Sequence, residues 1–315
     1  MNKCLHCYHE LSPQHEGDYH AHCCQAFFGT PNPPVLNYRF SEIEQLAKEV
    51  AELSISVPGV QPKLSLGWLK TKLENGHQGR LTIVDALQGN YILKPQNTLY
   101  PQMPENEHLS MKLAALFDID VVPASLIRMA SGELCYITKR IDRCPDGTKK
   151  HMIDFLQILE LEDKYKGTME ILGKAIGDLT VNTLLDKLRF FELAVFNYII
   201  GNNDMHLRNF SMLQSDIGWI LSPAYDLLNV KIILPQDHED SALLLGGKKK
   251  NFNKGYFDRL ASVLTLNRKQ VQVVYQRLYK RLPDATEMID RSFLSDDYKL
   301  TYKEIITQRA MLFEG

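Results

Sequence analysis

The sequence predicts an α+β fold with two lobes: a small, sheet-rich N-lobe and a larger C-lobe that is all-helical apart from one short hairpin. Before about residue 140, apolar residues mostly alternate with polar ones in short runs that Gly, Pro and Asn separate, as in β-strands. After about residue 150 the apolar spacing changes to the 3.6-residue period of helices. We therefore expect a Cys/His-rich segment over residues 1–36, an N-lobe over 37–143 and a C-lobe over 144–315.

The elements of the N-lobe follow from turn residues and capping signals. Ser41 and Glu44 form a capping-box pair, which predicts a helix to about residue 53. A second helix begins at Pro104, where acidic residues fill the first turn of "PENEHLSMKLAALFD". Strands are expected where "SVPGVQPKLSLGWL" leaves its Gly/Pro loop, and over residues 80–84, 90–95, 124–129 and 134–141.

The C-lobe elements follow from helical periodicity and one turn. Short strands over residues 210–214 and 219–228 flank a turn at Asp216. The remaining apolar runs predict helices near residues 152–160, 182–200, 256–264, 267–281, 284–291 and 296–313.

Composition excludes several classes of protein. The chain has 315 residues, 44% of them hydrophobic, and a net charge of -2, which is typical of a globular protein. A general nucleic-acid or membrane-surface binder would carry a basic excess. No apolar run approaches the ~20 residues that span a bilayer, and "MNKCLHCYHEL" has no apolar signal region. We therefore expect a cytoplasmic protein with reduced cysteines, no membrane contact and no sequence-specific nucleic-acid binding.

The loop "GNNDMHLRNF" carries the strongest chemical signal. Asp204 and Asn209 stand five residues apart as D-x-x-x-x-N, and Asp226 follows 17 residues later beyond the predicted hairpin. Carboxylate and amide oxygens are the ligands that Mg²⁺ takes alongside substrate phosphates. Protein kinases use this order, in which the first Asp orients the attacking hydroxyl and the Asn and second Asp hold the metal.

The other parts of a phosphoryl-transfer site also have candidates. Lys94 ends an apolar strand, where a kinase places the lysine that contacts ATP phosphates, and Glu105 or Glu107 on the next helix is its candidate partner, with Glu107 preferred. There is no G-x-G-x-x-G motif. The segment "SVPGVQPK" instead offers Gly59, Gln61 and Lys63 to cradle phosphates.

Each of these residues also has a purely structural interpretation. D-x-x-x-x-N is common by chance, Asp226 could be a turn residue, and Lys94 could be a solvated strand end. His206 and Arg208 could orient the loop, or one of them could offset charge on the transferring phosphoryl group. The order Lys, Glu, Asp, Asn, Asp on the expected elements favours the functional interpretation.

The sequence resembles the HipA family of bacterial serine/threonine protein kinases. The segments that match, in family order, are "SVPGVQPKLSL", "YILKP", "PENEHLSMKLA", "TKRIDR", "GNNDMHLRNFSML" and "PAYDLL". They span about residues 54–230, and the helical tail fits the family's C-terminal lobe. The resemblance implies a HipA-type, protein-kinase-like fold that uses ATP and Mg²⁺.

The resemblance also implies roles for individual residues. Asp204 would be the catalytic base, Asn209 and Asp226 would bind Mg²⁺, and Lys94 would contact ATP phosphates. The backbone near Ile137–Lys139 would meet adenine. Ser56 matches a self-phosphorylated serine of the family, and Ser54 is a second candidate. A phosphate on either serine would repel the phosphates of ATP, whereas the structural alternative is that both serines only shape the turn.

The family implies a toxin of a toxin–antitoxin pair. Its members phosphorylate translation components, notably aminoacyl-tRNA synthetases, and a HipB-type DNA-binding antitoxin holds them. Only 55 residues precede Ser56 here, whereas longer members carry a further β subdomain. This resembles the short, HipT-type branch, in which a separate small HipS-type protein can act as the antitoxin. Both a HipS-like and a HipB-like partner are therefore candidates.

The N-terminal segment holds a candidate zinc knuckle. Cys4, Cys7, His20 and Cys23 form C-x₂-C-x₁₂-H-x₂-C, and "DYHAHCC" offers His22 and Cys24 as alternative ligands. Four protein ligands would make the zinc structural, because no position stays open for catalysis. The alternative is a short hairpin with idle thiols.

The C-lobe sequence also contains a run of lysines. The segment "GGKKKNFNKGYF" gathers Lys248, Lys249, Lys250 and Lys254. It is either a solvated loop or a patch that steers an acidic protein or a tRNA-bound partner.

Two other functions are alternatives to a kinase. One is a catalytically silent kinase fold that only binds, and the other is a zinc-dependent nucleic-acid-binding protein.

Overall fold

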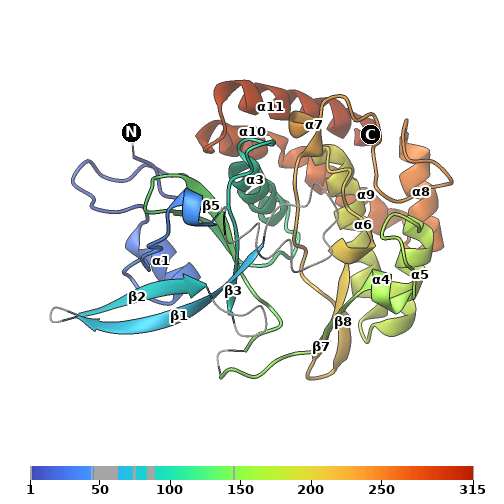
Figure 1. Ribbon diagram of the computed structural model, residues 1–315. Coiled ribbons are helices and arrows are strands. Elements are labelled where there is room, and N and C mark those ends of the chain that lie inside the picture. The colour runs from blue at the N-terminus through green and yellow to red at the C-terminus, as the bar shows by residue number, and fades with distance from the viewer. Residues whose placement is uncertain are drawn as a thin grey trace. The chain divides into compact units, whose positions relative to one another are not determined.

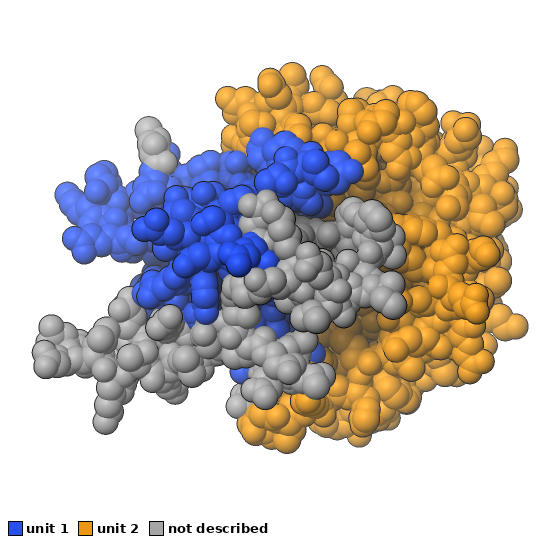
Figure 2. All heavy atoms as spheres, viewed as in Figure 1, with its two compact units in different colours: residues 1–108, 122–140, 291–293 blue, residues 109–121, 141–290, 294–315 orange. Residues whose placement is uncertain are grey.

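The structure is a computed structural model, and it describes residues 2–43, 45, 63–73, 76–83, 89–144 and 146–314. The chain divides into two compact units, which Figure 2 colours separately. Unit 1 comprises residues 1–108, 122–140 and 291–293, and unit 2 comprises residues 109–121, 141–290 and 294–315. Residues 1–36 thus belong to the same unit as the predicted N-lobe sheet.

Unit 1 is built on an antiparallel sheet (Figure 1). Its strands are β1 (Leu64–Leu73), β2 (Gly76–Ile83), β3 (Tyr91–Lys94), β4 (Ala124–Arg128) and β5 (Leu134–Lys139), in the order β2-β1-β3-β5-β4. The β4–β5 turn has Gly132 at φ 104°, a backbone angle that glycine adopts without steric cost. The β3–β5 register places Lys94 opposite Tyr136.

Helices α1 and α3 begin in unit 1, and residues 40–43 are also helical. Helix α1 (Ala21–Phe28) stops at Gly29, whose φ of 75° ends the helix in the left-handed conformation. Helix α3 (Met103–Leu116) matches the helix predicted from Pro104. The predicted helix over residues 41–53 lies mostly outside the described residues.

Unit 2 combines helices with a three-stranded sheet. Its elements, drawn in Figure 1, are β6 (Met152–Asp154), α4 (Phe155–Ile158), α5 (Met169–Leu179), α6 (Thr183–Ile200), η1 (Leu207–Asn209), β7 (Ser211–Ser215), β8 (Gly218–Leu221), α7 (Val230–Ile233), α8 (Lys254–Val263), α9 (Arg268–Lys280), α10 (Leu282–Arg291), α11 (Asp296–Ala310) and η2 (Met311–Phe313). The sheet order is β6-β7-β8, with antiparallel pairs. Helix α6 is central, and its Phe190, Phe191 and Phe196 are fully buried.

Three expectations for unit 2 need correction. Residues 152–154 form a strand that pairs with β7, and Asp154 caps α4 through a capping box with Gln157, so the helix begins only at Phe155; it ends at Ile158. The second strand of the hairpin ends at Leu221 instead of about residue 228, two residues before Pro223, which cannot donate to a sheet. Helix α5 was not predicted.

The described helices include none that is both long and apolar enough to cross a membrane. All six cysteines fall within the described residues, and none of them forms a disulfide.

Candidate active site

The loop after α6 presents Asp204, Asn209 and their neighbours. Helix α6 ends at Gly201, whose φ of 74° redirects the chain. The Asn202 side-chain amide then donates to Asn197 Oδ1 at 2.9 Å, and Asn202 Oδ1 accepts from the Asp204 backbone N–H at 3.3 Å. The polar residues of this loop therefore satisfy one another and hold Asp204 at an exposed position.

The Asp204 carboxylate accepts a hydrogen bond from a tyrosine that sequence reasoning missed. The hydroxyl of Tyr165 lies 3.1 Å from Asp204 Oδ1. Burial raises the pKa of Tyr165, and the charge of Asp204 raises it further, so the phenol stays protonated and donates. Tyr165 sits 39 residues earlier, in a loop with no motif, so no sequence signal marked it.

Asn209 ends the loop with its amide oriented by the backbone. Its side-chain nitrogen donates to the Asp204 carbonyl at 3.1 Å, and the side chain is buried except for 7% of its surface. The nitrogen is thereby used within the loop. The other end of the amide, Oδ1, is the atom that can serve as a metal ligand.

Asp226 follows the β7–β8 hairpin in an unusual conformation. Its φ is 58°, the left-handed region that few non-glycine residues other than Asn and Asp adopt. The preceding Tyr225 is fixed by two contacts, one to Ser211 Oγ at 2.5 Å and one to the Arg208 carbonyl at 3.0 Å. Because Arg208 is adjacent to Asn209, these bonds tie the Asp226 segment to the end of the Asp204–Asn209 loop. Such strain, held by surrounding contacts, is common at functional sites.

Unit 1 holds the predicted lysine in a buried ion pair. Lys94 Nζ lies 2.5 Å from Glu107 Oε1, and both side chains are at most 5% exposed. Glu105, the other candidate, instead accepts from the Gln96 amide at 2.9 Å. Burial raises the pKa of Glu105 although that hydrogen bond opposes the shift. Of the two candidate acids, Glu107 is therefore the partner of Lys94.

The backbone of Ile137–Lys139 does not favour the predicted contact with adenine. Strand β5 pairs with β3 on one side and β4 on the other, and the Lys139 N–H donates to the Pro123 carbonyl at 3.0 Å. The sheet thus uses backbone groups of this strand. The contact with adenine near Ile137–Lys139 stays a prediction.

The remaining candidates divide into described and undescribed residues. His206 is buried, and its ring packs against Tyr165 with centroids 5.4 Å apart, so it shapes the loop beside Asp204. Lys63 is exposed immediately before β1. The predicted phosphate-loop residues Ser54, Ser56, Gly59 and Gln61 lie outside the described residues.

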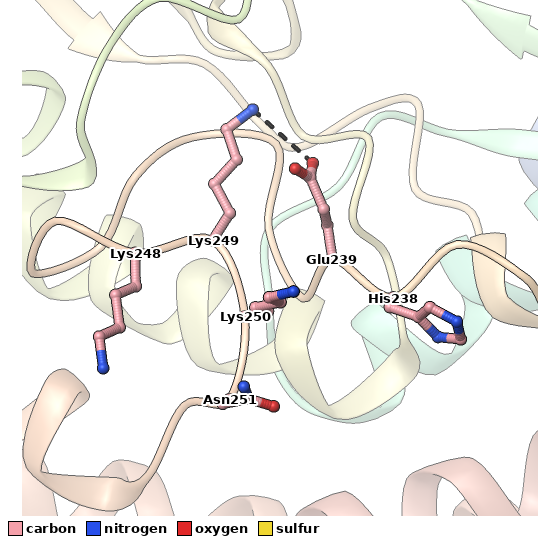
Figure 3. Close-up of a pocket in the computed structure, with 6 residues that line it drawn as sticks. All are labelled: His238, Glu239, Lys248, Lys249, Lys250 and Asn251. Atoms are coloured by element: carbon pink, nitrogen blue, oxygen red, sulfur yellow. Dashed lines mark ion pairs between the residues drawn. The ribbon is translucent and has the colours of Figure 1, made fainter.

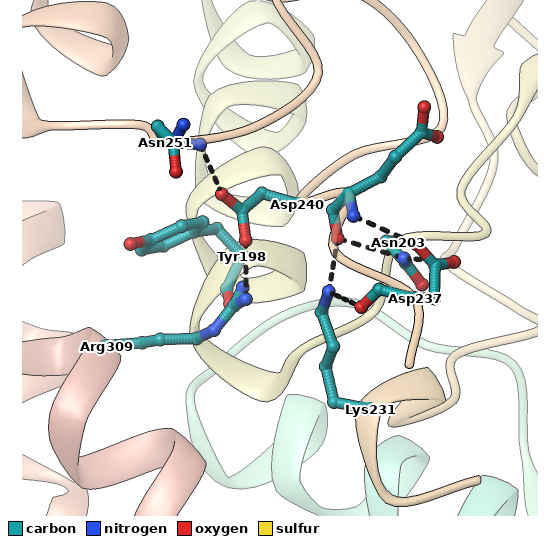
Figure 4. A network of polar contacts seen from close by, with 8 residues as sticks. Tyr198, Asn203, Lys231, Asp237, Asp240, Asn251 and Arg309 are labelled. Atoms are coloured by element: carbon teal, nitrogen blue, oxygen red, sulfur yellow. Dashed lines mark hydrogen bonds and ion pairs between the residues drawn. The ribbon is translucent and has the colours of Figure 1, made fainter. Parts of the chain in front are cut away.

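A polar network connects Asn203, in the loop after α6, with another segment of unit 2 (Figure 4). The Asn203 amide donates to Asp237 at 2.8 Å and to the Glu239 carbonyl at 2.9 Å. Lys231 Nζ reaches the same Glu239 carbonyl at 2.5 Å. Further along the segment, Asp240 pairs with Arg309 of α11 at 2.6 Å. Asn203, the residue before Asp204, is therefore anchored to the segment from Asp237 to Glu239, which Lys231 also contacts.

The predicted lysine patch lines an open pocket beside this network. The pocket has a volume of about 490 Å³, and its lining residues are His238, Glu239, Lys248, Lys249, Lys250 and Asn251 (Figure 3). Lys249 pairs with Glu239 at 3.7 Å, and its Nζ lies 5.8 Å from the centre of the Tyr165 ring. Tyr165 also contacts Asp204, so the pocket and the Asp204 loop share one neighbour.

The Cys/His segment gathers its four candidate ligands. One ligand atom from each of Cys4, Cys7, His20 and Cys23 lies within 4.8 Å of every other. A hydrogen bond with Cys7 lowers the pKa of Cys4, and the same bond raises that of Cys7. Cys24 is outside the cluster, and burial raises its pKa to about 11. The alternative ligands His22 and Cys24 are therefore not part of the group.

The fold and this arrangement define a protein-kinase-like protein. The model of the HipA-like C-terminal domain family matches residues 55–286. The chain belongs to that family.

Relatives of known name agree with this assignment. The chain is 31% identical over 269 residues to the candidate kinase Y4dM of Sinorhizobium fredii. The aligned region covers 76% of this chain and 63% of Y4dM. It is 25% identical over 257 residues to the serine/threonine-protein kinase toxin HipA of Shewanella oneidensis, covering 73% of this chain and 56% of that protein. The chain thus spans less than two thirds of the length of these relatives.

Solved structures show the same fold. HipA of Shewanella oneidensis, solved with HipB and operator DNA, superposes with a TM-score of 0.69 at 19% identity, covering 87% of this chain and 71% of that one. The proinflammatory kinase CtkA of Helicobacter pylori gives a TM-score of 0.54 at 16% identity, covering 80% of this chain and 94% of that one. The predicted kinase-like α+β fold is confirmed.

Proposed function

We propose that this protein is an ATP- and Mg²⁺-dependent serine/threonine protein kinase. The observation that carries the proposal is the tie between the Asp204–Asn209 loop and the strained Asp226 segment, made by the Tyr225 hydroxyl. Membership of the HipA-like family and the buried Lys94–Glu107 pair support it independently.

The residues present fit Mg²⁺. Asn209 Oδ1 and the Asp226 carboxylate are hard oxygen donors of the kind that this ion takes together with phosphate oxygens. When bound, Mg²⁺ neutralises charge on the phosphates of ATP. The Asp204 carboxylate orients the substrate hydroxyl and accepts its proton, and the ammonium of Lys94, held by Glu107, contacts the ATP phosphates. Tyr165 already occupies Asp204 Oδ1 with a hydroxyl, which is the contact that a Ser or Thr hydroxyl would make.

We further propose that the protein is the toxin of a toxin–antitoxin pair of the short, HipT-type branch. The named relative from Shewanella is a kinase toxin, and its structure is a complex with HipB and operator DNA. A HipB-like protein and a small HipS-like protein are the candidate partners, and a translation component such as an aminoacyl-tRNA synthetase is the candidate substrate. Induced expression should arrest bacterial growth, and expression of an Asp204→Asn variant at the same level should not. Equal arrest by both proteins would contradict a kinase-based toxin.

Self-phosphorylation is the first prediction that follows. Given ATP and Mg²⁺, the wild-type protein should gain about 80 Da, the mass of one phosphate group, on the peptide that contains Ser54 and Ser56. The added charge should then weaken ATP binding, because it repels the phosphates of the nucleotide. Peptide mass spectrometry measures the modification. A gain of the same size in the Ser54→Ala/Ser56→Ala variant would place the phosphate elsewhere.

Recognition of acidic substrate by the lysine pocket is the second prediction. Lys248 and Lys250 are exposed at the pocket whose Lys249 contacts Tyr165. Replacing both exposed lysines with Ala should raise KM about fivefold for the principal protein labelled in a bacterial lysate, since exposed charge pairs contribute about 0.5 kcal/mol each. The value of kcat should not change. The matched control is Lys269→Ala/Lys280→Ala on α9, which removes the same charge elsewhere. An equal rise in KM for that control would show a general charge effect and overturn the prediction.

A further inference from the structure

We propose that Cys4, Cys7, His20 and Cys23 bind one structural Zn²⁺ ion, and that this ion braces the second turn of α3, which carries Glu107. The ligands come from two separate turns. In the first, the Tyr8 N–H donates to the Cys4 carbonyl at 3.0 Å and the Cys4 N–H donates to the His9 carbonyl at 2.9 Å, a tight turn that places the first two sulfur atoms side by side. In the second, His20 is the residue immediately before α1, and Cys23 is the third residue of that helix.

The separations within the cluster suit tetrahedral zinc. Zn–S and Zn–N bonds of about 2.3 and 2.1 Å place neighbouring ligand atoms about 3.6–3.8 Å apart. Cys7 Sγ lies 3.4 Å from His20 Nδ1, and all four ligand atoms fall within 4.8 Å of one another. A set of three thiolates and one imidazole is a common structural zinc site.

The histidine is oriented as zinc ligands usually are. His20 Nε2 lies 3.1 Å from the Glu10 carbonyl oxygen. Because a carbonyl oxygen only accepts hydrogen bonds, Nε2 must carry the ring hydrogen. Nδ1 is then the ring nitrogen with a free lone pair, and this is the atom that faces Cys7. A carbonyl that fixes the tautomer and the ring angle is the usual outer support of a ligating His.

The Cys4–Cys7 turn is connected through Tyr8 to α3, the helix that carries Glu107. Tyr8, which follows Cys7, is 1% exposed, and its hydroxyl lies 2.7 Å from Nδ1 of the fully buried His108. His108 directly follows Glu107, the partner of Lys94. Because the Cys4–Cys7 turn positions Tyr8, an ion that fixes the turn also restrains the second turn of α3, where His108 lies. The metal site stands without the proposed kinase function, and only its relevance to Lys94 depends on that function.

Metal content of the full chain tests the site. Protein purified without chelator should contain about one zinc ion per chain, measured by inductively coupled plasma mass spectrometry. The Cys7→Ser variant should lose most of it, and the control variant Cys144→Ser, which alters a thiol of unit 2, should keep it. His20→Cys, which preserves four ligands, should also keep zinc if the site is tetrahedral. Absence of zinc together with failure of the reduced chain to take up added Zn²⁺ would overturn the proposal, as would a Cys4–Cys7 disulfide in the freshly purified protein.

Hydrogen exchange tests the bracing, without reference to kinase activity. Removing zinc from the wild-type protein with a chelator should raise exchange of the amides around His108 about tenfold or more, and Zn²⁺, but not Mg²⁺, should reverse the change. The Tyr8→Phe variant should keep its zinc and yet show faster exchange in the same turn of α3. Unchanged exchange there on zinc removal would overturn the bracing and confine the ion to the N-terminal segment.

Discussion

Replacing Asp226 with Asn should lower kcat/KM for phosphoryl transfer about 1,000-fold while the protein stays folded. Asn tolerates the left-handed backbone found at this position, so the change removes a charge without adding strain. Charge stabilisation by a bound metal contributes several kcal/mol to a transition state, and each 1.36 kcal/mol is a factor of ten in rate. The transfer rate from γ-labelled ATP, measured over a range of Mg²⁺ concentrations, checks the prediction.

The matched control for this variant is Asp216→Asn. Asp216 is exposed at the turn of the same β7–β8 hairpin, so its replacement makes an identical change in side chain and charge. The control should transfer at the wild-type rate, whereas Asp226→Asn should need more Mg²⁺ for half-maximal rate. An unchanged Mg²⁺ requirement in Asp226→Asn would remove this residue from the metal site.

Replacing Asp204 with Asn should lower kcat by about 1,000-fold and leave the binding of ATP and Mg²⁺ nearly unchanged. The new amide oxygen can still accept from Tyr165, so the loop keeps its shape. The amide cannot take a proton from the substrate, and such proton transfer contributes about 10²–10⁴-fold to rate. Titration calorimetry with ATP and Mg²⁺, beside the transfer assay, separates the two effects.

Asp178→Asn is the control for the Asp204 variant, because Asp178 is exposed on α5 and is not part of the loop. If Asp204→Asn lost ATP binding together with transfer, the residue would be structural. If it transferred at the wild-type rate, another group would be the base.

Much of the site could be predicted because its chemistry is local in sequence. Asp204 and Asn209 lie in one loop, and the spacing to Asp226 is set by a short hairpin. The choice of Glu107 over Glu105 also followed from helical spacing, and the structure pairs Glu107 with Lys94. Tyr165 and Tyr225 were missed, because their roles depend on contacts 39 and 17 residues away in the chain.

Helix α5 shows why some elements escaped prediction. Its sequence contains Gly173 and Gly177, and glycine weakens an isolated helix by about 1 kcal/mol per residue. The structure explains Gly173, because a Cβ there would lie 2.4 Å from Leu264 and 2.9 Å from Phe190. Close packing in unit 2 therefore requires a residue that local propensity disfavours. The sequence alone also did not reveal that β5 has neighbours on both sides, which bears on the predicted adenine contact near Ile137–Lys139.

The most direct test of a working kinase is the fate of the γ-phosphoryl group. Dephosphorylated wild-type protein, γ-labelled ATP and Mg²⁺ should be incubated with a bacterial lysate, and the labelled sites mapped by mass spectrometry. The account predicts label on Ser or Thr side chains, lost when Mg²⁺ is chelated and absent with Asp204→Asn. A wild-type protein that binds ATP but labels no protein, itself included, would contradict the account and indicate a kinase fold that only binds.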